Sequence, residues 1–315
     1  MRILITGAAG NLGSFTARYM LSGPHALRLM VRRRPPAEDL ARAPNVAVYR
    51  GDLSTPATLT EACRGVDVIV HFAGLLFAPR PERFLPKTNL QHVQHLVAAA
   101  QEAGVRKFIL ISFPHVEGES TPTRPPARQL DGRPAAGPPR PRLAPQQPHI
   151  GASRGTPMVP ISLRAGMIYG RGVLLIEAGR WLLRRRLLAV WPEPTWIHLL
   201  ALPDFLACVV AAIEGTPAAG IYNLGDDQPL TLQEFLDRIA AHWGFARPWR
   251  FPRWSFYLAA SAVEAFAAIF RTAAPLTRDF IRIGMASYVM DTTRMKRELR
   301  PRLAYPTLTE GLALL

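Results

Sequence analysis

The sequence predicts an α/β fold built on a doubly wound parallel sheet, with a smaller lobe formed by its C-terminal half. Short apolar segments alternate with helical ones through the first half of the chain, and strands that are apolar on both faces are typical of a parallel sheet covered by helices. A glycine-rich loop joins the first predicted strand to the first helix. The length of 315 residues, of which 49% are hydrophobic and 19% charged, suffices for a large buried core.

Predicted strands and helices alternate through the first half of the chain. Apolar runs predict strands at residues 2–6, 26–32, 46–52, 66–74 and 107–112. Helical periodicity predicts helices at residues 11–21, 58–65 and 88–103. The last of these ends before Gly104, a typical residue at the C-terminus of a helix.

The pattern is interrupted at residues 121–150, which contain nine prolines and five arginines. Prolines inside a helix remove hydrogen bonds and clash with the preceding turn, so we expect an irregular segment here. Regular patterning resumes with a strand and a glycine-rich turn at residues 158–172. Asp204 is the candidate N-cap of a helix at 205–215, and Thr231 with Glu234 predicts the capping box of another.

The longest apolar stretch, residues 254–270, is short for a membrane span and contains Glu264. We expect it to form a helix packed within the C-terminal lobe. Attachment to a membrane surface is the alternative.

The net charge of +15 raises the question of a nucleic-acid partner. Only three of the 38 basic residues are lysines, and the arginines are spread along the chain. Arginine, alanine and proline are all abundant in proteins of GC-rich genes, so we expect no nucleic-acid binding. Cys63 and Cys208 form neither a disulfide framework nor a metal-ligand spacing. Together with the lack of a signal peptide before the first strand, they favour a cytoplasmic protein without a metal.

The clearest motif in the sequence is the glycine-rich loop after the first predicted strand. Thr6, Gly7, Gly10 and Gly13 form the pattern T-G-x-x-G-x-x-G between a strand and a helix. Such a loop lets the backbone approach a pyrophosphate, and the helix N-terminus supplies free N–H groups and a favourable dipole. The sequence therefore predicts a dinucleotide site.

With this loop the chain resembles the extended short-chain dehydrogenase/reductase family, the NAD-dependent epimerase/dehydratases. Further similar segments are Gly51–Leu53, His71–Gly74, Asn89 at the start of a helix, "LRAGMIYGRG", "IYNLGDDQPLTLQEF" and "PTLTEGL". The resemblance implies a Rossmann-type NAD(P)-binding domain over residues 1–172 and a substrate lobe over 173–315, with 197–224 returning to the sheet. It implies cofactor contacts from Thr6, Gly7, Gly10, Asn11, Leu12, Gly13, Asp52, Leu53, Phe72, Ala73, Gly74, Asn89 and Ser112.

The end of the second strand indicates which nicotinamide cofactor is bound. NAD sites usually place an acidic residue there, whereas an arginine accommodates the 2′-phosphate of NADP. Here Arg32 and Arg33 follow the strand, and the first carboxylate is Glu38. We therefore expect NADP in preference to NAD, with a solvated basic turn as the alternative.

The usual catalytic residues of the family are missing. In the nearest register Phe113 takes the place of a catalytic hydroxyl, and Pro138 and Arg142 take the places of the tyrosine and lysine of the Y-x-x-x-K pair. Proline cannot transfer a proton, and arginine stays protonated. The catalytic residues are therefore unknown.

Three explanations stay open. The protein binds cofactor without the usual chemistry, or it uses another group among the weak candidates Ser112, His115 and Tyr169, or residues 123–150 are an out-of-frame reading of the gene. The first makes it an inactive sensor or assembly protein.

The sequence leaves the substrate open between two classes. A nucleotide-sugar diphosphate could be bound by arginines near Trp191 and Trp196, namely Arg180, Arg184, Arg185 and Arg186. The apolar stretch 254–270 instead suits a hydrophobic hydroxyl or keto substrate such as a sterol-like alcohol. The expected activity is that of an NAD(P)-dependent oxidoreductase or epimerase/dehydratase. By family analogy a homodimer is expected, and association with a membrane is not.

Overall fold

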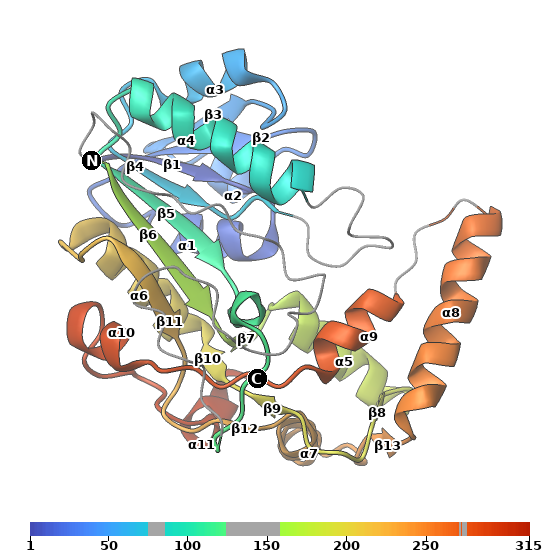
Figure 1. The fold of residues 1–315 in the computed structure, drawn as a ribbon. Helices are drawn as coiled ribbons and strands as arrows, with labels where there is room; N and C mark the ends of the chain where they lie inside the picture. The colour runs from blue at the N-terminus through green and yellow to red at the C-terminus, as the bar shows by residue number, and fades with distance from the viewer. Residues whose placement is uncertain (75–85, 124–157, 271, 273–275) are drawn as a thin grey trace.

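The computed structural model describes residues 1–74, 86–123, 158–270, 272 and 276–315. Its centre is a sheet of seven parallel strands in the order β11-β6-β5-β4-β1-β2-β3 (Figure 1). These strands are β1 (Arg2–Thr6), β2 (Ala26–Val31), β3 (Val46–Arg50), β4 (Val68–His71), β5 (Lys107–Ser112), β6 (Val159–Ala165) and β11 (Gly220–Leu224). The predicted α/β class and doubly wound sheet are confirmed.

Two hydrophobic cores hold the sheet, one on each face. Successive side chains of a strand point to opposite faces, so Ile3 and Ile5 enter one core and Leu4 enters the other. The helices are α1 (Asn11–Tyr19) and α6 (Leu202–Glu214) on the first face, and α3 (Pro56–Cys63) and α4 (His92–Glu102) on the second. Because helices cover both faces, the inner strands are mostly apolar, which is the pattern that the sequence showed, whereas the edge strand β3 is largely exposed.

The other elements form the lobe beyond the carboxyl ends of β5 and β6 or connect the strands (Figure 1). They are α2 (Glu38–Ala41), η2 (Pro86–Gln91), η3 (Pro114–Glu117), β7 (Met167–Tyr169), α5 (Leu174–Arg184), β8 (Ala189–Val190), β9 (Trp196–Ile197), β10 (Leu199–Ala201), β12 (Leu230–Thr231), α7 (Leu232–His242), β13 (Trp249–Arg250), α8 (Arg253–Phe270), α9 (Arg278–Met285), α10 (Thr293–Glu298), α11 (Leu308–Gly311) and η4 (Leu312–Leu314). Three two-stranded sheets pair β7 with β10, β9 with β12, and β8 with β13.

Asp204 does not cap α6, and that prediction was wrong. The helix begins at Leu202 after Ala201, with a proline in its first turn, a position where the fixed φ of proline favours the helix. The Asp204 carboxylate is fully buried and accepts the backbone N–H groups of Ala304 and Tyr305, each at 2.8 Å. The predicted cap of α7 is confirmed, because the Thr231 hydroxyl oxygen accepts the Glu234 N–H at 3.1 Å.

The apolar stretch at 254–270 forms helix α8, but the prediction that it packs within the lobe was wrong. Only Ala260 and Ala267 of this helix are buried, whereas Trp254 and Ile269 expose 67% and 74% of their surface. The helix lies at the edge of the molecule and packs against α9 along one side (Figure 1). Among the described residues, no helix is long and apolar enough to cross a membrane.

Candidate functional site

The glycine loop lies where the strand order of the sheet reverses. β1 is flanked by β2 on one side and by β4 on the other, so the chain winds outward in both directions from this point. Ligands of doubly wound sheets bind in the crevice at such a point, beyond the carboxyl ends of the strands. The first N–H groups of α1 have no carbonyl partner within the helix, and with the helix dipole they favour an anion at the loop.

Each glycine of the loop is required by a close backbone contact. Gly7 has a φ of +72°, and a Cβ there would lie 2.8 Å from the Ala73 nitrogen. A Cβ at Gly13 would lie 2.4 Å from the Gly7 oxygen, and one at Gly10 would lie 3.0 Å from the same atom. The loop therefore packs against itself and against the end of β4, which holds its N–H groups in one arrangement.

Residues at the end of β4 are fixed to the end of β1. The Thr6 hydroxyl and His71 Nδ1 are hydrogen-bonded at 2.7 Å, and the Phe72 N–H donates to the Thr6 carbonyl at 3.1 Å. Burial lowers the pKa of His71 to about 4, so its ring is neutral at neutral pH. Phe72, Ala73 and Gly74 thus lie beside the glycine loop, as the resemblance implies.

Asn11 has a tertiary role that the sequence did not reveal. Its side-chain amide donates to the Gly172 carbonyl at 2.9 Å, and its Oδ1 accepts the Leu174 N–H at 3.1 Å. Gly172 lies in the turn between β7 and α5, and Leu174 is the first residue of α5. The side chain therefore ties the glycine loop to the beginning of the substrate lobe and leaves the backbone N–H for a ligand, while Leu12 packs against the core.

The ends of β2 and β3 place charges on the same edge of the sheet. Arg32 and Arg33 follow β2 and are exposed. Asp52 follows β3, and its Oδ1 accepts the Ser54 N–H and hydroxyl, both at 2.8 Å. These hydrogen bonds, with Arg32 nearby, lower the pKa of Asp52. Leu53 beside it is half-buried against the second core.

Two further predicted contacts lie at the ends of β4 and β5. The π-helical turn η2 carries Asn89, whose Oδ1 would lie 3.8 Å from a Cβ at Gly74. Ser112 ends β5 and is buried, and its hydroxyl has no hydrogen-bond partner in the described part of the chain. A buried hydroxyl without a partner is rare in a folded protein. The orphaned hydroxyl and the glycine loop fit a nicotinamide dinucleotide lying along this edge.

The remaining weak catalytic candidates lie in apolar surroundings. The His115 ring lies 4.5 Å from the Tyr288 ring between centroids, and burial lowers the pKa of His115 to about 4. Tyr169 is fully buried, and a Cβ at Gly311 would come within 1.8 Å of its hydroxyl oxygen. Burial raises the pKa of Tyr169. Residues 124–157, which contain the positions of the missing tyrosine and lysine, lie outside the described residues, so the catalytic assignment stays a prediction.

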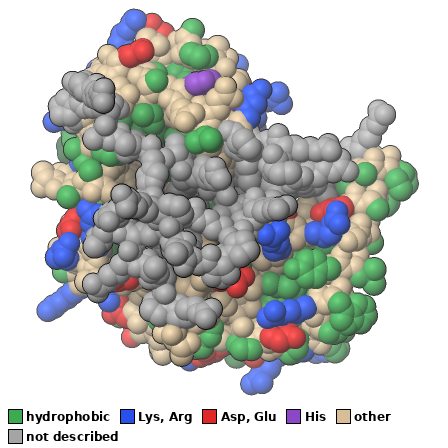
Figure 2. Space-filling view, in the orientation of Figure 1, with side chains coloured by type: hydrophobic (Ala, Val, Ile, Leu, Met, Phe, Trp, Pro, Cys, Tyr) green, Lys and Arg blue, Asp and Glu red, His purple; other side chains and the backbone are tan. Residues whose placement is uncertain are grey.

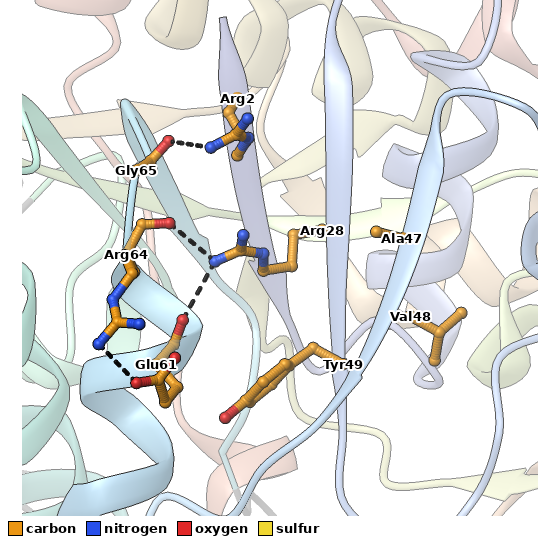
Figure 3. A pocket seen from close by; sticks show the side chains of 8 residues that line it. All are labelled: Arg2, Arg28, Ala47, Val48, Tyr49, Glu61, Arg64 and Gly65. Atoms are coloured by element: carbon orange, nitrogen blue, oxygen red, sulfur yellow. Dashed lines mark hydrogen bonds and ion pairs between the residues drawn. The ribbon is translucent and has the colours of Figure 1, made fainter.

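A surface pocket of about 420 Å³ lies away from this edge of the sheet (Figure 3). Arg2, where β1 begins, and Arg28 and Arg64 line it. Arg28 Nη1 donates to three carbonyls at the end of α3, those of Glu61, Ala62 and Arg64, at 2.7 to 3.2 Å. Arg28 thus binds carbonyls at the C-terminus of α3, and Arg2 binds the Gly65 carbonyl just beyond it. These contacts explain the positions of both arginines without an anionic ligand.

Comparison with known proteins agrees with this geometry. Residues 7–133, which include the glycine loop and the ends of β2 to β5, match the NAD(P)H-binding family. This part of the chain is therefore similar to NAD(P)H-binding domains. The resemblance that the sequence indicates is thereby confirmed, and with it a nicotinamide cofactor.

Two curated relatives and one solved structure show the range of similar proteins. The 2-alkyl-3-oxoalkanoate reductase of Stenotrophomonas maltophilia is 25% identical over 263 residues, 78% of this chain and 77% of the relative. The ceramide reductase of Caulobacter vibrioides is 37% identical over 110 residues, so the match spans 35% of this chain and about a third of that protein. UDP-glucuronic acid 4-epimerase of Bacillus cereus, with UDP-glucuronic acid and NAD, has the same fold. Its TM-score is 0.71 at 17% identity, over 100% of this chain and 97% of that one.

The stability of the substrate lobe is expected to depend on the ionisation of Asp226, which sequence reasoning missed. Its Oδ1 lies 3.7 Å from Nε2 of His198, whose Nδ1 accepts the Met290 N–H. Burial raises the pKa of Asp226 to about 8 and lowers that of His198, so both are neutral at pH 7.

Because the folded protein holds a proton that the unfolded chain releases near pH 4, this carboxyl makes stability fall as pH rises from about 4 to 8. Asp226→Asn is expected to reduce that fall, measured by urea denaturation across this pH range. The same slope in both proteins would contradict the raised pKa. Asp227→Asn, at the half-exposed neighbour, is the control.

Proposed function

We propose that the protein is an NADP(H)-dependent oxidoreductase that acts on a hydroxyl or keto group of a hydrophobic substrate. The proposal is supported by the edge of the sheet at which the glycine loop, Asp52 and the unpartnered Ser112 hydroxyl lie. The bound nicotinamide would supply or accept a hydride. The cytoplasmic location and the homodimer stay predictions.

The preference for NADP rests on the turn after β2. Arg32 and Arg33 are exposed, and Arg33 makes no ion pair with any carboxylate of the described residues. Guanidinium groups bind phosphate with charge-assisted, often bidentate hydrogen bonds. No acidic residue stands at the end of β2 to hold the 2′-hydroxyl of NAD.

The proposed hydrophobic substrate class is supported by the contacts of two arginines in the C-terminal lobe and by two relatives. Arg180 and Arg185, which the sequence offered for a diphosphate, are exposed and stack on Trp243 and Trp181. Such cation–π contacts account for their positions without a nucleotide sugar. Relatives that align with three quarters of the chain are a 2-alkyl-3-oxoalkanoate reductase and a ketoreductase of a farnesyl quinoline oxide. These supports favour a keto group on a hydrophobic molecule.

The residues at this edge of the sheet would have separate roles in binding the cofactor and in orienting the substrate. The glycine loop and Asp52 would hold the cofactor, and the Ser112 hydroxyl would donate a hydrogen bond to the substrate oxygen, orienting the reacting carbon. His115 is neutral at pH 7 because burial lowers its pKa to about 4, so it is a poor proton donor there. The proposal therefore assigns no proton donor among the glycine loop, Asp52, Ser112 and His115.

The wild-type protein is expected to bind NADPH more tightly than NADH, and Arg32→Ala with Arg33→Ala is expected to remove the difference. Loss of contacts to a charged phosphate costs about 1.5 kcal/mol at an exposed site, roughly a tenfold change in affinity. Fluorescence titration with both cofactors measures it. Arg42→Ala, an exposed arginine paired with Glu38, is the matched control. Equal affinity of the wild-type protein for both cofactors would rule out the preference.

Turnover is tested in the same preparations. NADPH oxidation is followed with a 3-oxoalkanoate ester, whereas NADP+ reduction and epimerisation are followed with UDP-glucuronic acid. Oxidation with the ester supports the proposed reaction. Oxidation or epimerisation of the nucleotide sugar alone would replace it with the other substrate class. Tight NADPH binding without turnover over a panel of ketones and alcohols would favour the inactive sensor or assembly protein.

A further inference from the structure

Helix α8 exposes its apolar side to solvent. At about 100° per residue, its exposed large hydrophobic side chains fall within one arc of roughly 220°. They are Trp254 (67% exposed), Tyr257 (37%), Leu258 (65%), Phe266 (57%), Ile269 (74%) and Phe270 (61%). A surface helix of a globular protein ordinarily turns its apolar stripe to the core, whereas α8 is apolar on its exposed side as well as on its buried side.

Specific contacts on the inner side of α8 fix which side of the helix is exposed. The Phe256 ring packs edge-on against Trp191, with centroids 5.5 Å apart. The carboxylate of Glu264 accepts the backbone N–H and the Nε–H of Arg278, both at 2.8 Å. The only acidic residue of the helix therefore faces α9, and turning the apolar arc inward would break this ion pair.

The apolar surface continues beyond the start of α8. Trp249 and Phe251 directly precede the helix and are 54% and 47% exposed. Trp249 Nε1 donates to the Arg186 carbonyl at 3.0 Å, which places it beside the end of α5. Figure 2 shows hydrophobic side chains gathered on this side of the molecule, with basic and acidic ones among them. We call α8, Trp249 and Phe251 the apolar edge.

The charge beside the apolar edge is positive. Arg184, Arg186 and Arg247 are exposed and have no carboxylate partner among the described residues. The acidic groups nearby are all paired, Glu193 with Arg253, Asp237 with Arg250 and Glu264 with Arg278. The arginines therefore present uncompensated positive charge at the border of an apolar surface.

We propose that the apolar edge docks on the surface of a membrane that contains anionic lipids. Aromatic and aliphatic side chains at the headgroup boundary, with arginines beside them, are the combination by which an interfacial helix binds such a surface. A second copy of the chain is the less suitable occupant, because it would bring the same unpaired arginines and a further net charge of +15 against the first. The inference stands independently of the proposed reaction.

Co-sedimentation with lipid vesicles tests the proposal without cofactor or substrate. The protein is expected to bind vesicles of phosphatidylcholine mixed with phosphatidylglycerol and to bind pure phosphatidylcholine much more weakly. Arg184→Ala with Arg247→Ala is expected to weaken binding to the anionic vesicles by roughly fivefold per arginine. Leu258→Ser with Ile269→Ser is expected to weaken it by on the order of tenfold or more. All four positions are exposed, so the fold should survive.

Tyr19→Ser with Val48→Ser is the matched control, because these exposed residues (49% and 42%) lie on the Rossmann sheet and α1. Unchanged binding of this control supports the assignment to the apolar edge. The proposal is overturned if the wild-type protein does not bind anionic vesicles, or if the double variant Leu258→Ser with Ile269→Ser binds them as tightly as the wild-type protein does. A dimer seen by light scattering that the same double substitution dissociates would assign the apolar edge to a second copy instead.

Discussion

Gly13→Ala is expected to weaken the binding of the nicotinamide dinucleotide by roughly a hundredfold, about 2.8 kcal/mol. The new methyl carbon would lie 2.4 Å from the Gly7 oxygen, so the loop and the first turn of α1 must separate. The N–H groups that face the pyrophosphate then lose their arrangement. Fluorescence titration with NADPH gives the affinity, and thermal unfolding reports any loss of fold.

Gly179→Ala is the matched control for this change. It lies inside α5, and a Cβ there meets nothing within 4 Å, so cofactor affinity should stay as in the wild-type protein. Wild-type affinity in Gly13→Ala would show that the loop is not the pyrophosphate site, or that it yields without cost.

Asp204→Ala is expected to lower the free energy of unfolding by about 3–5 kcal/mol, as removing one member of a buried charged network does. The carboxylate accepts N–H groups from Ala304 and Tyr305, and Arg300 Nε lies 3.4 Å from it. Without it, two backbone N–H groups of the C-terminal segment lose their partner. Urea denaturation measures the change.

Asp237→Ala removes a carboxylate from a partly exposed ion pair with Arg250 and is expected to cost less than about 1 kcal/mol. Similar losses in the two variants would mean that Asp204 contributes no more than a surface pair. A larger loss in Asp204→Ala would show that one buried carboxylate fastens the C-terminal segment to α6.

The sequence predicts the sheet and the glycine loop because both depend on local pattern. Strand residues such as Ile3, Leu4 and Ile5 are apolar whichever face they enter, and Gly7 and Gly13 are spaced as the strand-turn-helix geometry demands. The position of Asp52 likewise follows from the end of its strand.

The sequence could not predict contacts between distant segments. Asn11 bonds the turn at Gly172, and Asp204 bonds Ala304, although both residue types commonly cap helices nearby. The orientation of α8 escaped prediction because most of its residues are apolar, so periodicity alone does not say which side is buried. Contacts with distant residues, those of Glu264 with Arg278 and of Phe256 with Trp191, distinguish the two sides.

The pairing of β5 with β6 has a consequence for the segment between them. Their register runs from Lys107 opposite Val159 to Ser112 opposite Arg164, so the sheet fixes both ends of the connection. The entropy of closing a long connection changes by only about 0.6 kcal/mol for each doubling of its length. A change in the length of this connection is therefore expected to cost the paired strands little. The resemblance places the family's tyrosine and lysine within this connection, so changes in its length are expected to affect catalysis more than folding.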